Sequence, residues 1–394
     1  MVWNGPPHGR ANFRGITMTR PNDSSPESTT TQTVLLFAMV VWMVLTARSL
    51  FAQTPASENA TREPASAQVA TLEAKGSHYK AERGPYETGE ALLTLKDAAR
   101  KKDVQIRVRF PKNVPGPVPL VLFSHGMGGS NNAFTELTTH WASHGYVVIL
   151  PTHEDSVALK KSKGEDVSEF LTSPNKYVRN VDPPGRVADL SLILDQIDMI
   201  QKDVGLKTTD GTPLVDMEHV GVAGHSAGAL TTQLAIGVKA RTKKHPLRAL
   251  SEPEKRFDCA VVISGQGTTN RMFTADSWSE VSKPMFVIAG SEDVTRVGSE
   301  TPASRREPFE RAKPGDKYLL WIEGATHSSY QGKQHLALMG EKPTTDLSII
   351  TAATADGTLA FLDAYLKQDE TAKRYLHSDD LKTISGGKAT LDRK

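Results

Sequence analysis

One pentapeptide in this chain has the residue types and the spacing of a serine nucleophile. The segment 224–228, GHSAG, matches the G-x-S-x-G pattern, in which a sharp turn between a strand and a helix exposes the serine hydroxyl. An apolar strand candidate, 220–223, precedes the motif, and a helix candidate, 229–238, follows it. We therefore predict that Ser226 attacks a carbonyl carbon. The alternative interpretation is a glycine-rich structural turn.

A second motif, SHGMGG at 124–129, directly follows the apolar strand candidate 120–123. Acyl transfer needs N–H donors where the oxyanion forms, and the loss of one donor lowers the rate by about 10²–10³. A loop of this kind supplies one donor, and the residue after the nucleophile supplies the other. We predict an oxyanion hole made of the backbone N–H groups of Met127 and Ala227. The alternative is an anion-binding or flexible glycine loop, although the spacings typical of phosphate and dinucleotide binding are absent.

A serine hydroxyl needs a base, and the chain contains 12 histidines. We prefer His327, because it follows the last apolar strand candidate, 318–322, and should therefore lie at the same sheet edge as Ser226. Other histidines belong to the glycine motifs, lie upstream of the serine or lie farther from a strand end; these are His125, His225, His140, His144, His153, His335 and His377.

The acid that orients His327 is predicted to be Asp293. It ends the segment GSED, which follows the apolar strand candidate 285–289. Glu292 is the nearest rival. Two further acids are weaker candidates because no buried strand precedes them, namely Asp276 and Asp316.

Apolar runs that alternate with amphipathic segments indicate how these groups are positioned. Two candidates with alternating polar residues, 91–95 and 104–110, suit antiparallel edge strands. Continuous apolar runs suit strands buried on both faces, and they occur at 120–123, 146–150, 220–223, 260–263, 285–289 and 318–322. Apolar residues at helical spacing predict helices within 187–200 and 361–366. We expect an α/β fold with a mostly parallel sheet of about eight strands and helices on both faces.

The N-terminal region has the pattern of a signal peptide. Residues 34–45 are continuously apolar, which is too short for the ~20 residues of a membrane span but suits a signal-peptide core. Ala52 is a plausible cleavage point, so we expect a secreted or periplasmic protein without a stable membrane span; an uncleaved anchor is the alternative. The expected organisation is a leader over 1–52, a flexible linker over 53–83, a catalytic domain over 84–370 and a C-terminal tail over 371–394.

Composition argues against several classes of partner and site. The 394 residues carry a formal net charge of +2. Nucleic-acid binding requires clustered positive charge, so we expect no nucleic-acid partner. The short basic runs 241–245 and 305–306 are expected to be solvated surface. Cys259 is the single cysteine; it cannot form an intramolecular disulfide or a cysteine-rich metal site, and its apolar neighbours predict burial.

From residue 84 to 367 the chain resembles α/β-hydrolases of the dienelactone-hydrolase-like, chlorophyllase and platelet-activating-factor acetylhydrolase group, with cutinase-like polyesterases as neighbours. The order of serine, acid and histidine is that of this fold. The resemblance implies a carboxylic-ester substrate, either a small molecule or lipid-like, and no metal or organic cofactor. It is carried by LFSHG at 122–126, ASHGY at 142–146, GRVAD at 185–189, GHSAG at 224–228 and GSED at 290–293.

The expected reaction is two-step acyl transfer through an acyl-enzyme, as in a serine esterase. Lipase, phospholipid acetylhydrolase and polyester hydrolase are the alternatives on this fold. Cutinase-like enzymes tend to have an aromatic residue and a methionine where this chain has Met127 and Ala227, which disfavours polymer hydrolysis. A binding protein that kept the fold is a further class. A metal-dependent hydrolase is disfavoured because H-E-x-x-H is absent.

Two polar stretches, 154–184 and 295–314, follow strand candidates at the predicted catalytic edge. Long loops at such an edge often contact substrate or form a lid. Solvated insertions are the alternative.

Overall fold

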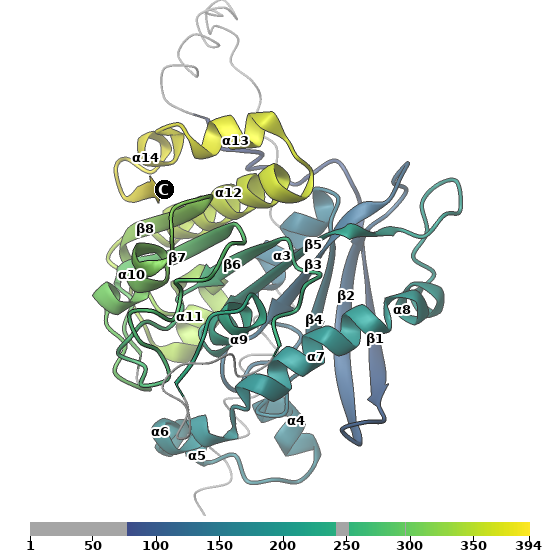
Figure 1. Cartoon of the computed structure of the whole chain (residues 1–394), viewed down its shortest axis with the longest axis horizontal. Coiled ribbons are helices and arrows are strands. Elements are labelled where there is room, and N and C mark those ends of the chain that lie inside the picture. The colour runs from purple at the N-terminus through teal and green to yellow at the C-terminus, as the bar shows by residue number, and fades with distance from the viewer. Residues whose placement is uncertain (1–76, 242–251, 296) are drawn as a thin grey trace, which may run out of the picture. The chain divides into compact units, whose positions relative to one another are not determined.

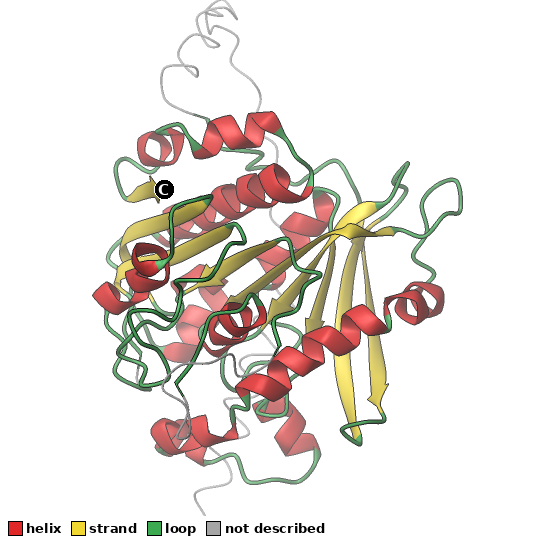
Figure 2. Cartoon of the chain, viewed as in Figure 1, coloured by secondary structure: helices red, strands yellow, loops and turns green. Residues whose placement is uncertain are grey.

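The computed structural model describes residues 77–241, 252–295 and 297–394. The described residues form a nine-stranded sheet in the order β1-β2-β4-β3-β5-β6-β7-β8-β9. Helices cover both faces of this sheet (Figures 1 and 2). The strands are β1 (Thr88–Asp97), β2 (Lys102–Pro111), β3 (Val118–Ser124), β4 (Val147–Pro151), β5 (Val215–His225), β6 (Cys259–Ile263), β7 (Met285–Glu292), β8 (Lys317–Thr326) and β9 (Ala389–Arg393).

The sheet is parallel through its centre and antiparallel at both edges. The six central strands, β4, β3, β5, β6, β7 and β8, run parallel to one another, whereas β1 with β2, β2 with β4, and β9 with β8 pair antiparallel. Every residue of β3, β4 and β6 is buried, because helices cover both faces there. β1 instead alternates between exposed and less exposed residues, as expected of an edge strand. The predicted α/β fold with a mostly parallel sheet is therefore confirmed.

The helices divide between the two faces, and each set encloses its own apolar core. One core contains residues of α7, α8, α9 and α10, and the other contains residues of α3, α12 and α13. α7 and α9 lie in front of the strands in Figure 1. The helices are α3 (Thr135–Ser143), α4 (Val157–Ser162), α5 (Glu169–Thr172), α6 (Pro174–Tyr177), η1 (Val178–Asn180), α7 (Pro183–Asp195), α8 (Ile197–Val204), α9 (Ala227–Ala235), α10 (Pro302–Arg311), η2 (Ser329–Gln331), α11 (Lys333–Met339), α12 (Leu347–Leu366), α13 (Glu370–Leu376) and α14 (Asp380–Ile384).

Both ends of the expected catalytic domain differ from the sequence-based boundaries. Residues 371–394 were expected to be a tail, but they contribute to α13, form α14 and form β9, which pairs with β8. Residues 77–83 were assigned to the linker, yet Tyr79 is buried and its hydroxyl donates to Asp363 Oδ2 at 3.0 Å. These contacts join residues far apart in the chain, so local composition does not reveal them.

α12 is the one helix in the described part of the chain that is long and apolar enough to cross a membrane. Two thirds of its apolar window is buried inside the protein, as in the core helix of a soluble fold. The predicted signal-peptide core, 34–45, and the predicted cleavage point at Ala52 lie outside the described residues.

Candidate active site

Ser226 occupies a strained turn between β5 and α9. Its φ of 55° and ψ of −117° are rarely adopted by residues with a side chain. The turn is held on both sides, since the Ser226 N–H donates to Ile263 O at 3.1 Å and Gln266 Nε2 donates to Ser226 O at 3.1 Å. Strain of this kind persists only where the surroundings over-determine it. The turn places the serine at the carboxyl end of β5, as the motif predicts.

The two glycines of the motif are required by close backbone contacts. A Cβ on Gly224 would lie 2.3 Å from the carbonyl oxygen of Gly228. A Cβ on Gly228 would lie 1.8 Å from the carbonyl oxygen of Ser124, at the end of β3. α9 therefore starts in direct contact with β3, and only glycine permits this approach.

The structure brings Ser226, His327 and Asp293 together. Ser226 Oγ lies 2.9 Å from His327 Nε2, and His327 Nδ1 lies 2.9 Å from Asp293 Oδ1. Asp293 directly follows β7, and His327 directly follows β8. Since parallel strands present their carboxyl ends at one edge of the sheet, three distant segments meet there.

The rival acids lie elsewhere. Glu292 accepts a hydrogen bond from Thr344 Oγ1 at 2.6 Å, away from the histidine. Asp316 accepts from Tyr365 at 2.8 Å. The geometry therefore favours Asp293 over the alternatives that the sequence left open.

Asp293 is completely buried and surrounded by donors. Ser264 Oγ donates to Oδ1 at 2.7 Å, Tyr330 donates to Oδ2 at 3.2 Å, and Arg305 Nε lies 3.3 Å from Oδ1. Burial alone would raise the pKa of Asp293. The Arg305 guanidinium and the hydrogen bonds from His327 and Ser264 outweigh burial and hold the pKa of this carboxyl well below its usual range. The acid is therefore ionised at neutral pH.

Arg305 occupies a position that differs from the one expected from the sequence. It was expected on the solvated surface beside Arg306, but it is 1% exposed and donates to the carbonyls of Ser264 and Gly265 at 2.9 and 3.0 Å. Neighbouring helix positions point about 100° apart, so Arg306 lies outside while Arg305 lies inside. Phe309, four positions later, is buried on the same face of α10 and was the available signal.

The predicted oxyanion loop lies beside the serine. A Cβ on Gly126 would lie 3.6 Å from Ser226 Cβ. Among the described residues, the Met127 N–H makes no backbone hydrogen bond, and the Ala227 N–H is the first of α9, where N–H groups have no partner within the helix. Both groups are thus available as donors, and their role in an oxyanion hole stays a prediction.

His225 packs against His327 and contacts its backbone. The two rings lie 4.7 Å apart, and His225 Nε2 lies 2.8 Å from the His327 carbonyl oxygen. Burial, with the neighbouring His327, lowers the pKa of His225 well below its usual range, so this ring is neutral. Its place in the motif gives no hint of this contact, because the partner is 102 residues away.

The two polar stretches, 154–184 and 295–314, contact each other. α4, α5 and α6 form the first, and α10 lies in the second. The Gly298 N–H donates to Asn175 Oδ1 at 3.0 Å, which joins them. α5 also covers the oxyanion loop, because a Cβ on Gly128 would lie 2.3 Å from the Phe170 ring. Both stretches are therefore neighbours of the site.

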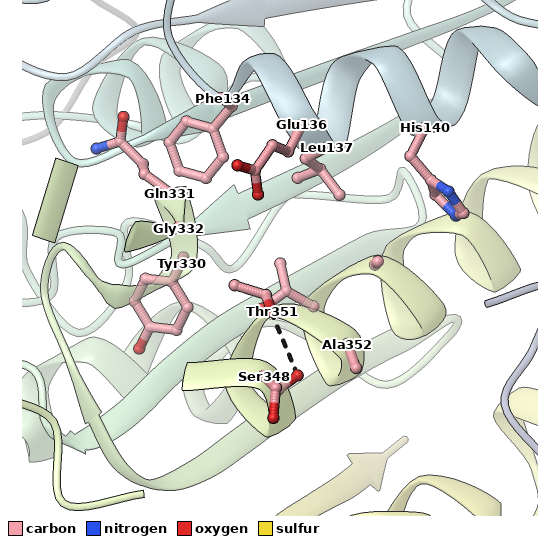
Figure 3. Close-up of a pocket in the computed structure, with 12 residues that line it drawn as sticks. Phe134, Glu136, Leu137, His140, Tyr330, Gln331, Gly332, Ser348, Thr351 and Ala352 are labelled. Carbon is pink, nitrogen blue, oxygen red and sulfur yellow. Dashed lines mark hydrogen bonds between the residues drawn. The ribbon is translucent and has the colours of Figure 1, made fainter. Parts of the chain in front are cut away.

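A cavity of about 310 Å³ lies between α3, η2 and α12. Figure 3 shows side chains from these three helices around it. None of Ser226, His327 and Asp293 lines it, but the ring of Tyr330 does, while the Tyr330 hydroxyl reaches Asp293. Its other lining residues are Phe134, Glu136, Leu137, His140, Gln331, Gly332, Ser348, Thr351, Ala352, Thr354 and Ala355.

Cys259 is completely buried in β6, and burial raises the pKa of its thiol, so it has the properties of a core residue. Among the residues that the structure describes, no group of three or more His, Cys, Asp or Glu side chains is arranged to hold a metal ion.

Comparison with known proteins finds similarity to one family. Residues 84–179, which run from before β1 into η1 and include the predicted oxyanion loop, match the model of platelet-activating factor acetylhydrolase, isoform II. The platelet-activating factor acetylhydrolase of Cavia porcellus is 21% identical over 279 residues, covering 64% of this chain and 58% of its own length. That of Canis lupus familiaris is 23% identical over 281 residues, covering 63% of this chain and 57% of its own.

The chain thus spans less than two thirds of the length of these relatives. The family model ends before Ser226, so its match covers none of Ser226, Asp293 and His327. Together, the topology and these similarities identify the chain as an α/β-hydrolase similar to the platelet-activating factor acetylhydrolases.

Proposed function

We propose that this protein hydrolyses carboxylic esters, with Ser226 as the nucleophile, His327 as the general base and Asp293 as the acid that orients the histidine. The observation that carries this proposal is the unbroken row of two 2.9 Å contacts from Ser226 Oγ through the imidazole to Asp293. A buried, ionised acid at one end and a strained serine at the other give each group the environment its role requires.

The proposed reaction has two steps. His327 Nε2 takes the proton of Ser226 as the oxygen attacks the ester carbonyl, and the N–H groups of Met127 and Ala227 stabilise the negative oxygen. The intermediate collapses when His327 returns the proton to the leaving alcohol, which leaves an acyl-enzyme. Water, deprotonated by the same histidine, then attacks the acyl carbon and releases the acid and the free serine.

The proposed substrate is a short-acyl ester of a lipid-like alcohol. The similarity to acetylhydrolases supports an acetyl or similarly short acyl group. Two large apolar side chains exposed in the described structure, Leu171 and Val178, lie on the stretch 154–184, and a third, Val294, directly precedes the stretch 295–314. Such side chains suit an alcohol with an apolar portion.

Ser226→Ala tests the nucleophile. We expect it to lower kcat for p-nitrophenyl acetate by at least about 10³-fold, because the acyl-enzyme no longer forms, and to abolish labelling by a fluorophosphonate probe. Ser348→Ala, at the start of α12, is the matched control and should retain both. Hydrolysis by Ser226→Ala at the wild-type rate would refute the assignment.

A p-nitrophenyl ester series from acetate to palmitate tests the acyl preference. We expect kcat/KM to fall as the acyl chain lengthens beyond a few carbons. A maximum at long chains would indicate a lipase instead.

We further propose that the protein is exported. This rests on the apolar run 34–45, followed by Ala52, and both lie outside the described residues. N-terminal sequencing of the protein purified from its source should begin at Gln53. A chain that retains residues 34–45 would instead indicate a membrane anchor.

A further inference from the structure

The oxyanion loop, residues 125–129, rests on a buried ion pair between Arg186 of α7 and Asp155. These residues are 2% and 1% exposed. Arg186 Nε donates to Asp155 Oδ1 at 2.9 Å, and Arg186 Nη2 donates to Asp155 Oδ2 at 2.8 Å. A two-point contact of this kind fixes the plane of the guanidinium. The remaining donors are therefore held in fixed directions.

The same ion pair binds the loop on both sides of Met127. Arg186 Nη1 donates to His125 O at 2.7 Å, and Arg186 Nη2 reaches Gly126 O at 3.4 Å. Asp155 Oδ2 accepts the Gly128 N–H at 3.0 Å. Three polar groups of the loop thus contact two buried charges.

The orientation of the peptide group between Gly126 and Met127 determines the direction of the Met127 N–H. A trans peptide is planar, so its carbonyl and its N–H point in opposite directions. When the Gly126 oxygen is held toward the interior, the Met127 N–H must point out of it. Two donors besides Arg186 hold that oxygen, His125 Nδ1 at 2.6 Å and the Gly129 N–H at 3.1 Å. A flipped peptide would lose all three contacts.

His125 can donate to the Gly126 oxygen because its protonation is fixed. The backbone N–H of His153 donates to His125 Nε2 at 3.0 Å, so the proton of the His125 ring must lie on Nδ1. Burial, with the nearby Arg186 charge, lowers the pKa of His125 well below its usual range and keeps the ring neutral.

His153 is in turn held by two buried groups. Its Nδ1 lies 2.8 Å from Asp189 Oδ2, and its Nε2 lies 2.9 Å from Ser124 Oγ. Ser124, His153 and Asp189 have the same residue types as the candidate triad. Ser124 is completely buried, however, so its hydroxyl is not accessible to a substrate. This buried group of three residues therefore supports the loop, and Ser124 does not act as a second nucleophile.

We propose that Arg186 is a positioning residue for the reaction, because it fixes the Gly126–Met127 peptide with the Met127 N–H directed at the oxyanion before substrate binds. The inference rests on the proposed esterase function. An oxyanion donor acts on the transition state, so Arg186 should affect kcat much more than KM.

The test compares Arg186→Met with Arg109→Met. Arg109 of β2 is also 2% exposed and ion-paired, with its Nε 3.1 Å from Glu90, but its hydrogen bonds go to Asn132, Thr135 and Thr138 and to none of residues 125–129. Arg186→Lys and Asp155→Asn are the gentler variants: the first keeps the charge without the two-point geometry, and the second keeps the shape of the carboxyl group. For each folded variant, kcat and KM for p-nitrophenyl acetate are measured together with Ki for an alkyl boronic acid, whose tetrahedral serine adduct mimics the oxyanion.

In the Arg186 and Asp155 variants we expect kcat to fall about 10–100-fold, KM to stay within about threefold, and the boronate Ki to rise by the same factor as kcat falls. Arg109→Met should leave kcat and Ki near wild type. The inference is overturned if the folded variants keep kcat and Ki within twofold of wild type, or if kcat falls while Ki does not change. If wild-type protein neither hydrolyses esters nor reacts with a fluorophosphonate, the proposed function itself has failed.

Discussion

Arg305 and Asp293 show how a buried charge pair sets the properties of single residues in the site. Arg305 is 1% exposed and Asp293 is completely buried, so little solvent screens the 3.3 Å contact between them. The guanidinium lowers the pKa of the carboxyl and so keeps it ionised. This effect bears on the pH dependence of the proposed reaction.

Arg305→Met should move the acidic limb of the kcat/KM profile to higher pH. Without the guanidinium, burial is opposed less strongly and the pKa of Asp293 rises, so this carboxyl becomes protonated, and stops orienting His327, at a higher pH than in wild type. The measurement is kcat/KM for p-nitrophenyl acetate from pH 4 to 9, on protein shown to be folded by circular dichroism.

Arg306→Met is the matched control for this change, because the adjacent side chain lies on the outer face of α10 and pairs with Glu310. Its pH profile should equal that of wild type. A limb that stays in place or moves to lower pH in Arg305→Met would contradict the assigned effect of Arg305.

At the scale of elements, the contact of α9 with β3 determines where Ser226, the proposed nucleophile, lies. Gly228→Ala places a methyl group 1.8 Å from the Ser124 oxygen, which forces α9 and β3 apart. We expect the free energy of unfolding to fall by about 3 kcal/mol or more, and ester hydrolysis to be lost with it. Urea denaturation measures the first effect. Gly116→Ala, where a Cβ would meet nothing within 4 Å, should cost little, and equal stability of the two variants would refute this account.

Much of this element-level arrangement can be predicted from the chain. The eight strands β1 to β8 follow from alternating or continuous apolar runs, and Ser226, Asp293 and His327 each follow such a run. The groups that support the triad cannot be found in this way. Ser264 and Tyr330 reach Asp293 from segments 29 and 37 residues away, and neither lies in a recognisable motif.

At the scale of the whole molecule, ionised carboxylates are buried both in the candidate triad and in the network around His153. Asp293, Asp155 and Asp189 are each at most 1% exposed, and each has a pKa below its usual range despite burial. For Asp189, burial acts to raise the pKa, but hydrogen bonding and charge from His153 and the Lys102 charge lower it to about 2. The free energy of unfolding should therefore decrease as the pH becomes acidic.

The direction of this dependence follows from the pKa values. The unfolded-state pKa of an aspartate is about 3.9, so the folded form of Asp189 releases its proton more readily than the unfolded form. The contribution to stability is present above about pH 4–5 and disappears as the pH falls toward 2. From the two pKa values it amounts to about 2–3 kcal/mol.

Asp189→Asn should consequently destabilise the protein at pH 7 and flatten the decline of its stability between pH 5 and 3. Urea denaturation at a series of pH values measures this. Asp198→Asn, on the exposed side of α8, should show the same dependence of stability on pH as wild type. An Asp189→Asn variant that declines as steeply as wild type would show that this carboxylate is not a source of the acid sensitivity.

β9 carries a practical consequence for anyone who shortens the protein. The composition suggests an end to the domain near residue 370, but β9 covers one side of β8, where Leu320 pairs with Leu391. A protein cut at residue 370 would leave β8 with a row of unsatisfied backbone groups facing water. Such an edge recruits strands from other molecules, so the truncated protein should precipitate although every residue of the candidate site is intact.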